Sequence, residues 1–588
     1  MDDLVLERDA WSKLQSTPSD ARLCFLGNGY RHKTPSCYVA SSQRLPRCYT
    51  QAMRSADRWL APTLAEFESF VAEGVWKIPD IDPALIPPDQ IIPSMLVYDA
   101  QFYPDGSWKK DKCRLVSRGD VFKRMFLTEN YSGTVRPEAV RMMLGAAAEM
   151  DLEMACVDAK TAFLNSPVEE GVVMYMRRPP GVPDSLMPEI VQLQKYIYGL
   201  PQASKKFREH SDRTLRALGF TPNITDPCVY TKKVKGEYIF VTVHVDDFGI
   251  MAPTKALVQA TIEGLAKTYK LVITPDLKFY LGLNIVRDRA NRTITISQDG
   301  YVEEFLDTYG IIPSASTNFP LTPMASTETN PRDETPFEME QSLFPILSPP
   351  MITLYQAKVG SLNYLAGHTR PDILFAVTMA SRRNQSPTMR DMEAVNRILW
   401  YVAGTKHLGL RFHSGEGVRL YASVDASYAN HLDRKSHTGC TLHIGRHSAS
   451  WNSLSKKQTV TADSSTVAEF IATHTAAKEI MWARMFLKEI GFPQDSPTIL
   501  FEDNQSTIAM IERPGNGQKT KHIDVRFNLI REQVLKKVIV MTYLRTEDMT
   551  SDILTKGLSK VPFLHLRPKL LGMSAGKRSR QGCSAVSP

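Results

Sequence analysis

The segment YIFVTVHVDDFGIMA, residues 238–252, places two adjacent aspartates between two runs of β-branched and apolar residues. Such runs predict strands, and the short interval between them predicts a hairpin with Asp246 and Asp247 at its tight end. An Asp-Asp pair alone is weak evidence for a site, because a solvated hairpin turn often carries aspartate. The pair therefore needs support from a second element that carries an acid.

The segment MACVDAKTAFLN, residues 154–165, supplies that second element. Asp158 follows the apolar Ala-Cys-Val, and the aromatic Phe163 comes shortly after it. Mg²⁺ requires several hard oxygen ligands at one place. Carboxylates from two neighbouring strands, together with substrate phosphates, would hold two such ions, or Mn²⁺ in their place, for in-line phosphoryl transfer. The two segments together favour a two-metal site.

The stretch between Lys109 and Arg124 is strongly basic, with seven Lys or Arg residues against Asp111 and Asp120. A local excess of positive charge suits a phosphate-bearing ligand, while a solvated charged hairpin is the alternative. Overall charge is a weaker argument: the net charge is +8, but residues 565–588 alone hold five basic residues and no acid. Local patches must therefore indicate any nucleic-acid ligand.

Four acidic residues stand at the ends of predicted elements in the C-terminal part of the chain. Asp425 follows the strand-like LYASV, and Glu469 is expected in the first turn of a helix predicted over 466–490. Asp503 follows the strand TILFE, and Asp552 begins a short helix. An acid at a helix start is often only a partner of the helix dipole. Four acids at strand ends and helix starts of one α/β unit are harder to explain in that way.

The composition is that of a globular protein. The 588 residues are 43% hydrophobic and 23% charged, which excludes a collagen-like, fibrous or fully disordered chain, and the length suggests about four units at roughly 150 residues each. We expect no membrane partner, because no run of 18 apolar residues exists and the acidic N-terminus lacks a signal-peptide core. Eight cysteines without a CxxC pair favour a reducing compartment. A zinc knuckle is the alternative near the N-terminus, although its ligands have unusual spacings: Cys24, His32, Cys37 and Cys48.

A proline-rich segment divides the chain. Eight prolines lie between Pro313 and Pro350, mixed with acids, Ser and Thr, and they predict an extended connector. Upstream, from about Trp59, the sequence predicts mixed α and β structure, including a helix over 137–150. Downstream, two helical stretches precede a block that begins near Gly417, where antiparallel strands lead into alternating helices. That order predicts a mixed sheet covered by helices.

Motifs along the chain occur in the order seen in copia-type long-terminal-repeat retrotransposons. Residues 46–315 resemble their reverse transcriptase on the segments KCRLVSRG, VDAKTAFLN, MYMRRPPG, IYGLPQA, HVDDFGI and FYLGLNI. Residues 416–560 resemble their RNase H domain on the segments SVDASYAN, SWNSLSKKQ, DSSTVAEFIA, EDNQSTIAM, TKHIDVRF and TSDILTK. Residues 316–415 match the connector between the two. We therefore expect a fragment of a Pol polyprotein, with an N-terminal extension (1–45) and a basic tail (561–588).

The resemblance implies an α/β (α+β) fold: a right-hand polymerase with fingers, palm and thumb, then a connector, then an RNase H-like mixed-sheet domain. In the palm it implies that Asp158 and Asp246 bind the metal ions, with Asp247 beside them. The family usually has tyrosine where this chain has His244. That position lies next to the primer end, so fidelity or affinity is expected to differ.

The resemblance also implies a nucleotide site. Phe163 is expected to be the steric gate that disfavours a ribose 2′-OH, and Gln202 is expected to line the incoming nucleotide. Contacts with the triphosphate are expected from Lys110, Lys112 and Arg114.

In the RNase H-like part, the resemblance implies that two Mg²⁺ ions are held by Asp425, Glu469, Asp503 and Asp552. The sequence departs from the family pattern at three positions outside these four: Ser427, Tyr428 and Val467. Contacts with the hybrid backbone are expected from Lys456, Lys457, Lys519 and Lys521, although exposed lysines are usually only solubilising.

The implied activity is that of an RNA-directed DNA polymerase with RNase H activity. It would use an RNA template, a DNA or tRNA primer and dNTPs, and would degrade the RNA strand of the RNA–DNA hybrid. Integrase or capsid products of the same element are implied partners. The implied location is cytoplasmic, in a virus-like particle, with a nuclear alternative if the KRSR segment at 577–580 acts in import.

A decayed or domesticated nucleic-acid-binding relic is the alternative function, motivated by the missing upstream domains and by His244. A metabolic α/β enzyme lacks support, because the sequence contains neither a GxGxxG motif nor a P-loop.

Overall fold

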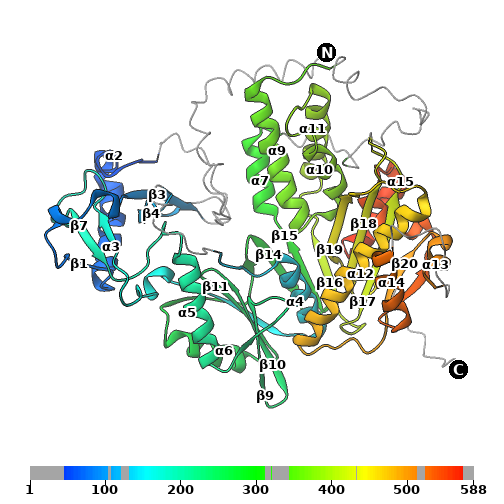
Figure 1. Cartoon of the computed structure of the whole chain (residues 1–588), viewed down its shortest axis with the longest axis horizontal. Helices are drawn as coiled ribbons and strands as arrows, with labels where there is room; N and C mark the ends of the chain where they lie inside the picture. The colour runs from blue at the N-terminus through cyan, green and yellow to red at the C-terminus, as the bar shows by residue number, and fades with distance from the viewer. Residues whose placement is uncertain are drawn as a thin grey trace.

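The computed structural model describes residues 45–102, 108–120, 131–311, 320, 344–431, 433–512 and 524–573. Several sequence-based predictions lie outside these residues: the zinc alternative except Cys48, most of the proline-rich connector, Lys519, Lys521 and the KRSR segment. The described chain is mixed α/β, as the sequence predicted, and its strands form five sheets. Figure 1 shows the N-terminal elements at the left, a central sheet, an upright group of helices and a C-terminal sheet at the right.

The described part of the N-terminal region begins with two short helices and one long helix, and it contains two sheets. The helices are α2 (Tyr49–Ala52), η2 (Met53–Ser55) and α3 (Ala56–Ala72). A four-stranded sheet has the order β1 (Trp76–Lys77), β7 (Ile190–Leu193), β6 (Tyr175–Arg177) and β2 (Ile91–Ile92). A separate antiparallel ribbon consists of β3 (Ser94–Phe102) and β4 (Trp108–Ser117).

Helix α3 holds the ribbon of β3 and β4 in place. Trp59 of the helix contacts Tyr98 of β3 edge to face, with ring centroids 5.2 Å apart. Arg58 forms a bidentate ion pair with Asp111 of β4, with both N–O distances at 2.7 Å. Since successive strand residues face opposite sides, the side chains next to Asp111 in β4 point away from the helix.

A six-stranded sheet occupies the centre of the molecule. Its order is β12 (Leu271–Pro275), β5 (Glu153–Ala159), β11 (Asp247–Ala252), β10 (Glu237–His244), β9 (Val229–Val234) and β8 (Thr221–Pro222). The helices around it are α4 (Pro137–Met150), α5 (Ala203–Ala217) and α6 (Lys255–Ala266), and α4 confirms the helix predicted over 137–150. Val157 and Phe248 lie in the core on the side of α5 and α6, whereas Cys156 and Met251 lie in the core on the side of α4.

A smaller sheet joins distant parts of the chain. Its order is β13 (Phe279–Tyr280), β14 (Leu283–Asp288), β15 (Thr293–Ser297) and β16 (Leu410–His413). Between β15 and β16 the chain forms the upright helices of Figure 1, α7 (Asp299–Thr308), α9 (Pro349–His368), α10 (Leu374–Ser381) and α11 (Met389–Gly404). Helix α15 (Lys560–Leu570), where a basic tail was expected, adds Phe563 and Leu566 to the core of these helices. Within the described residues, no helix is both long and apolar enough to cross a membrane.

The C-terminal sheet has five strands, in the order β19 (Ser450–Lys457), β18 (His437–Ile444), β17 (Leu420–Ser427), β20 (Thr498–Glu502) and β21 (Ile539–Tyr543). β19, β18 and β17 are antiparallel, and β20 and β21 are parallel additions. The flanking elements are α12 (Ser465–Glu489), α13 (Gln505–Glu512), α14 (Asp524–Leu535) and η9 (Thr550–Leu554). This arrangement confirms the predicted mixed sheet covered by helices.

The long helix of this domain begins one residue earlier than predicted. Ser464 caps it by accepting a hydrogen bond from the backbone N–H of Val467 at 3.3 Å. Glu469 is therefore the fifth residue of α12 and lies in its second turn, so the prediction that placed it in the first turn is wrong. Its carboxylate is too far along the helix to be a simple dipole partner, because that effect falls off within the first turn.

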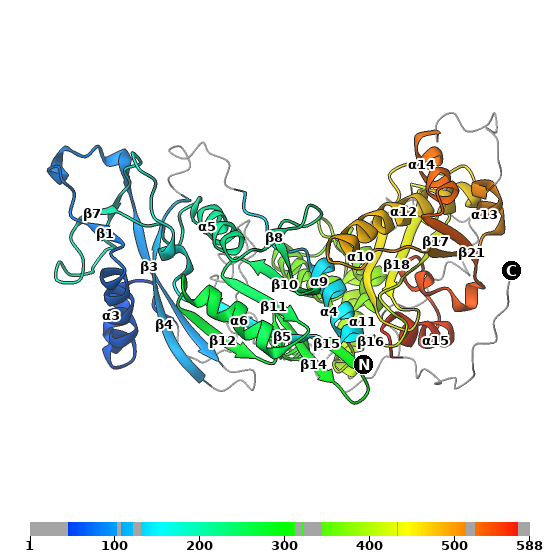
Figure 2. The ribbon, with the colours of Figure 1, turned by 90° about the horizontal axis from the view of Figure 1, so that it is seen from below.

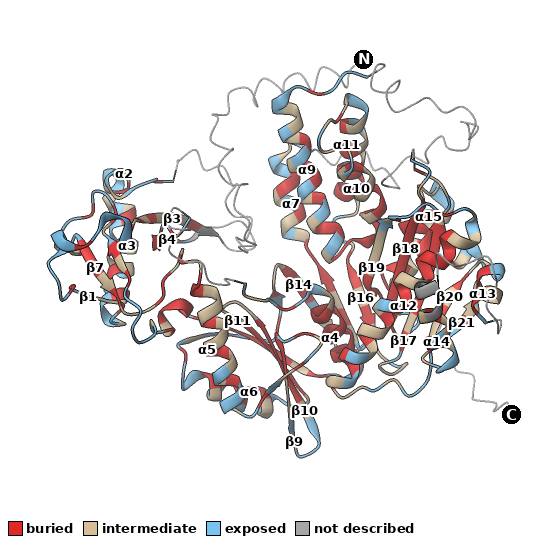
Figure 3. Cartoon of the chain, in the orientation of Figure 1, coloured by how far each residue is buried: buried red, intermediate tan, exposed pale blue. Residues whose placement is uncertain are grey.

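Helix α4 lies between the central and the C-terminal sheets (Figures 1 and 2). Its buried residues Met143 and Ala147 belong to the same core as β14 to β16 and the strands of the C-terminal sheet. In Figure 3, α4 and the neighbouring strands are coloured largely as buried. The two halves of the chain are therefore joined by a common core.

Arg141 of α4 is a buried charge at this junction, with 4% of its surface exposed. Its Nε donates to the backbone oxygen of Trp451 in β19 at 2.6 Å, and its Nη1 donates to that of Gly367 near the end of α9 at 2.8 Å. Burial lowers the pKa of the guanidinium. One side chain thus connects the central sheet, the upright helices and the C-terminal domain.

Arg141→Met is expected to destabilise the protein by about 3 kcal/mol, because it removes the donor to the buried backbone oxygen of Trp451 and to the part-buried one of Gly367. Differential scanning calorimetry would detect a lower melting temperature. Arg289→Met is a matched control, since Arg289 makes its ion pairs with Asp151 and Glu153 at the surface and such pairs contribute about 1 kcal/mol or less. Equal melting temperatures for the two variants would contradict a structural role of Arg141.

Candidate active sites

The central sheet places the Asp-Asp pair at the end of a hairpin, as the sequence predicted. Strands β10 and β11 are antiparallel, and His244 pairs with Asp247 across a two-residue turn of Val245 and Asp246. Val245 has a φ of 55°, a left-handed conformation that is costly for a β-branched residue. The tight turn places Asp246 at the end of the hairpin formed by β10 and β11.

Asp158 lies beside this turn. β5 pairs with β11, and Asp158 is directly opposite Asp247, so their side chains project from the same face of the sheet. The backbone N–H of Ala159 donates to the backbone oxygen of Asp246 at 2.9 Å. The three predicted palm carboxylates therefore lie together where β5 ends and where the turn leads from β10 into β11.

Burial makes these carboxylates costly to ionise. Burial first, and then repulsion from Asp246, raises the pKa of Asp158, and burial also raises the pKa of Asp246. The pKa of Asp247 is raised to about 7 by burial and by the charges of Asp246 and Asp158. Hard cations would relieve this repulsion, so the donor set fits divalent metal ions. Among the described residues, the carboxylate oxygens of Asp158, Asp246 and Asp247 do not converge as closely as those of the C-terminal acids described below.

The predicted triphosphate contacts lie on one side of β4. Lys110, Lys112 and Arg114 alternate along the strand with Asp111, which faces α3. The positive charges of Lys112 and Arg114 act on both Asp158 and Asp246 and favour their ionised forms. The ribbon therefore presents a cationic side toward the palm carboxylates.

The two residues predicted to contact the nucleotide, Phe163 and Gln202, are buried. Phe163 is 8% exposed in the short helix η5 (Ala162–Asn165), and its ring contacts Tyr198 with centroids 4.6 Å apart. Gln202 is also 8% exposed, at the start of α5, and its Oε1 has no hydrogen-bond partner among the described residues. A buried amide oxygen without a partner is costly, which is consistent with a group kept for a ligand.

The C-terminal sheet gathers a second set of acids. Asp425 lies within β17, rather than after it as predicted, and Asp503 directly follows the neighbouring parallel strand β20. Glu469 reaches them from α12, and one carboxylate oxygen from each of the three lies within 4.8 Å of the others. Asp552 approaches from η9, linked to Asp425 through the Lys556 ammonium.

The electrostatics of this cluster favour a bound cation. Burial raises the pKa of Asp425, and burial together with the charge of Asp425 raises the pKa of Glu469 well above its ordinary value. Glu469 Oε2 is buried and has no hydrogen-bond partner among the described residues. Three converging oxygen donors and an unpaired carboxylate oxygen are the donor set that Mg²⁺ or Mn²⁺ prefers.

Sequence reasoning missed three residues of this cluster. Glu502 is completely buried at the end of β20 and accepts a hydrogen bond from Thr473 of α12 at 3.2 Å. Lys556 Nζ lies 3.0 Å from Asp552 Oδ1 and 3.8 Å from Asp425 Oδ2. Thr555 Oγ1 donates to Asp425 Oδ2. A Glu next to Asp503 and the Thr-Lys that ends TSDILTK were visible in the sequence, but nothing local showed that they face the acids.

The other predicted positions around this cluster lie nearer the surface. Tyr428 is 45% exposed and Lys456 is exposed, whereas Lys457 forms an ion pair with Asp433. Ser427 and Val467 are half-buried. None of these residues contributes an oxygen to the group formed by Asp425, Glu469 and Asp503.

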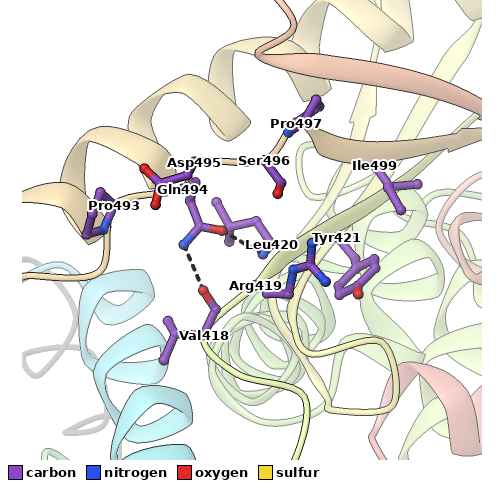
Figure 4. Close-up of a pocket in the computed structure, with 10 residues that line it drawn as sticks. All are labelled: Val418, Arg419, Leu420, Tyr421, Pro493, Gln494, Asp495, Ser496, Pro497 and Ile499. Carbon is purple, nitrogen blue, oxygen red and sulfur yellow. Dashed lines mark hydrogen bonds between the residues drawn. The ribbon is translucent and has the colours of Figure 1, made fainter. Parts of the chain in front are cut away.

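A small cavity of about 240 Å³ opens at the start of β17 (Figure 4). Gln494 crosses it, donating to the backbone oxygen of Val418 at 2.7 Å and accepting from the backbone N–H of Leu420 at 3.1 Å. The lining contains none of the predicted site residues. Because Asp425 lies further along the same strand, the cavity is separate from the acidic cluster.

The raised pKa values predict a pH-dependent stability. Asp247 has a pKa of about 7, and Glu502 and Asp552 have pKa values of about 8, against ordinary values of 3.8 for Asp and 4.5 for Glu. Between pH 4 and 8 these three groups bind more protons in the native state than in the unfolded state, so their contribution to the stability of the metal-free protein should fall as pH rises. Mg²⁺ should restore it most at pH 8, because carboxylates must be deprotonated to bind a metal.

Thermal melting at pH 5 and pH 8, with EDTA or with Mg²⁺, would measure this effect. Asp552→Asn should reduce the loss of melting temperature between the two pH values. A larger stabilisation by Mg²⁺ at pH 5 than at pH 8 would contradict the prediction.

Comparison with known proteins places the chain in a family. Residues 87–324 match the model of the reverse transcriptase (RNA-dependent DNA polymerase) family. The retrovirus-related Pol polyprotein from transposon RE2 of Arabidopsis thaliana is 30% identical over 528 residues, which cover 89% of this chain and 34% of that protein. A putative transposon Ty5-1 protein of Saccharomyces cerevisiae is 31% identical over 329 residues, which cover 55% of this chain and 100% of that protein.

These similarities define a reverse transcriptase family protein. More specifically, the chain belongs to the family of copia-type retrotransposon Pol polyproteins, as the motifs predicted. It spans about a third of the length of the Pol polyprotein from RE2.

Two solved structures show weaker similarity. A prototype foamy virus protease–reverse transcriptase matches 88% of this chain and 55% of that chain, with 12% identity and a TM-score of 0.26. LC11-RNase H1, isolated from compost, matches 24% of this chain and 93% of that chain, with 12% identity and a TM-score of 0.20. At TM-scores this low, neither structure establishes the fold of this chain.

Proposed function

We propose that the chain is an RNA-directed DNA polymerase with RNase H activity from a copia-type retrotransposon. One observation carries the proposal: two separate sets of carboxylates, half-buried in the central sheet and buried or half-buried in the C-terminal sheet, lie on two sheets that share one core. The N-terminal ribbon would form the fingers, the central sheet the palm and the upright helices the thumb and connector. The C-terminal mixed sheet would be the RNase H-like domain.

In the polymerase site, Asp158 and Asp246 would hold the metal ions, with Asp247 supporting them. When bound, divalent ions would activate the primer 3′-OH and neutralise charge that develops at the α-phosphate. Lys112 and Arg114 would bind the triphosphate and stabilise the departing pyrophosphate through preorganised positive charge. Lys110, which is exposed, would add to this attraction at the edge of the site.

The nucleotide itself would lie between the ribbon and η5. Phe163, held by its contact with Tyr198, would occupy the space that a ribose 2′-OH needs. The unpaired oxygen of Gln202 would accept a hydrogen bond from the bound nucleotide. These two side chains would therefore select and orient the substrate.

In the nuclease site, Asp425, Glu469, Asp503 and Asp552 would hold metal ions that activate water and stabilise the leaving 3′-oxygen. Lys556 and Thr555 would orient Asp425 and Asp552 through the contacts described above. The substrate would be the RNA strand of an RNA–DNA hybrid.

The proposed partners are an RNA template, a DNA or tRNA primer, dNTPs and the hybrid product. Integrase and capsid products of the same element are further proposed partners, and the proposed location is a cytoplasmic particle with a nuclear stage.

The test uses purified protein on poly(rA)·oligo(dT) with dTTP and Mg²⁺, and separately on a labelled RNA–DNA hybrid without dNTPs. We expect incorporation in the first assay and RNA cleavage in the second. A folded protein that binds the hybrid but does neither would instead be a nucleic-acid-binding relic.

A further inference from the structure

Tyr198 contacts two residues that the proposed function assigns to different parts of the nucleotide. Its ring meets Phe163 edge to face, at a centroid distance of 4.6 Å and an interplanar angle of 75°. On another side, the guanidinium carbon of Arg114 lies 5.6 Å from the centroid of the same ring. One side chain thus touches both the proposed sugar gate and the proposed triphosphate contact.

The backbone around Tyr198 holds the ring in this position. The backbone N–H of Ser117, at the end of β4, donates to the backbone oxygen of Tyr198 at 2.8 Å. Gly199 follows with a φ of +92°, and a Cβ at this glycine would lie 2.0 Å from the backbone oxygen of Ser117. Only glycine satisfies both the left-handed conformation and this close approach. The turn that carries Tyr198 is therefore locked against the strand that carries Arg114.

A row of aromatic rings continues from Phe163 into α5. Phe207 of α5 is 1% exposed and meets Phe163 edge to face, with centroids 6.2 Å apart. The order Phe207, Phe163, Tyr198 and Arg114 runs from the buried helix to the cationic ribbon. Because each ring restrains the next, a change at Tyr198 would be felt by both the gate and the guanidinium.

The palm carboxylates lie close enough to act on the phenol. Burial, followed by the charge of Asp246, raises the pKa of Tyr198, and Asp158 acts in the same direction. The phenol therefore stays neutral and leaves the positive charge of Arg114 available to a phosphate. The ring is the useful part of this side chain, rather than a titrating hydroxyl.

We propose that Tyr198 is a positioning residue that couples the sugar gate Phe163 to the triphosphate contact Arg114. It sets the KM for the incoming deoxynucleotide and the discrimination against ribonucleotides at the same time. This inference rests on the proposed polymerase function, because it assumes that the nucleotide lies between Phe163 and Arg114.

The test compares Tyr198→Leu with Tyr198→Phe on poly(rA)·oligo(dT), using dTTP and UTP as competing substrates. Loss of the ring should raise the KM for dTTP about five- to tenfold and reduce the preference for dTTP over UTP by a similar factor. The kcat for dTTP should stay within about twofold. Tyr198→Phe keeps the ring and should behave like the wild type in both measurements.

Melting temperature and hybrid cleavage monitor the fold of each variant. Unchanged KM and unchanged UTP discrimination in Tyr198→Leu would overturn the inference, as would equal losses of kcat in both variants with a lower melting temperature. A wild-type protein that incorporates no dTTP would overturn the proposed function and this inference together. If the wild type incorporates dTTP normally but Tyr198→Leu does not change KM or UTP discrimination, only this inference fails and the proposed function stands.

Discussion

Asp246→Asn is expected to lower dTTP incorporation on poly(rA)·oligo(dT) by about a thousandfold or more, while cleavage of a preformed hybrid stays at the wild-type rate. Asparagine keeps the shape of the side chain but removes the charge that a hard cation requires. A loss of about 4 kcal/mol of transition-state stabilisation corresponds to this factor. The tight turn of Val245 and Asp246 also leaves no second acid that can take the same place, since Asp247 already belongs to β11.

Single-turnover incorporation at saturating Mg²⁺ would measure the effect. Asp276→Asn is the matched control, because Asp276 is exposed beyond the edge strand of the same sheet. Substantial synthesis by Asp246→Asn would show that the palm assignment is wrong. A parallel loss of hybrid cleavage would show instead that the substitution damages the whole chain.

Asp503→Asn is expected to have the opposite effect: RNA cleavage should fall by about a thousandfold, and DNA synthesis should be unchanged. Asp503 is one of the three acids whose oxygens lie within 4.8 Å of each other. Its hydroxyl partner, Thr546 Oγ1 at 2.6 Å, can still donate to the asparagine oxygen. The local structure should therefore survive while the charge needed for the cation is lost.

Cleavage of an end-labelled RNA–DNA hybrid without dNTPs would measure this prediction. Asp495→Asn is the matched control in the same domain, since Asp495 is exposed at the cavity of Figure 4, away from the acidic cluster. Continued cleavage of the hybrid by Asp503→Asn would show that the four acids do not form the nuclease site. Loss of both activities would indicate that the two halves depend on each other through their shared core.

Local patterns were enough to predict the elements that carry the acids. The runs of β-branched and apolar residues on each side of Asp246 predicted β10 and β11, and the helix predicted over 466–490 matches α12 to within one residue. These elements depend on near neighbours in the chain, for which periodicity and capping are informative. The acids on these elements could therefore be named as candidates from sequence.

The convergence of the acids could not be derived from local pattern. Asp158 and Asp247 are opposite each other only because β5 pairs with β11 in one register, and a shift of one residue would turn one carboxylate to the other face. Glu469 reaches the cluster from the second turn of its helix, and Glu502 was overlooked beside Asp503. Tertiary contacts decide these positions.

The sequence by itself predicted the family and most of the strands and helices that carry the candidate acids, because periodic apolar residues and ordered motifs are properties of the chain alone. Only the tertiary structure decided which side chains meet. It placed β16 beside β15 although α7, α9, α10 and α11 lie between them in the chain, buried Arg141 between three parts of the molecule, and set Tyr198 between Phe163 and Arg114. Such contacts join residues far apart in sequence, and their energies depend on packing and burial that no local pattern contains.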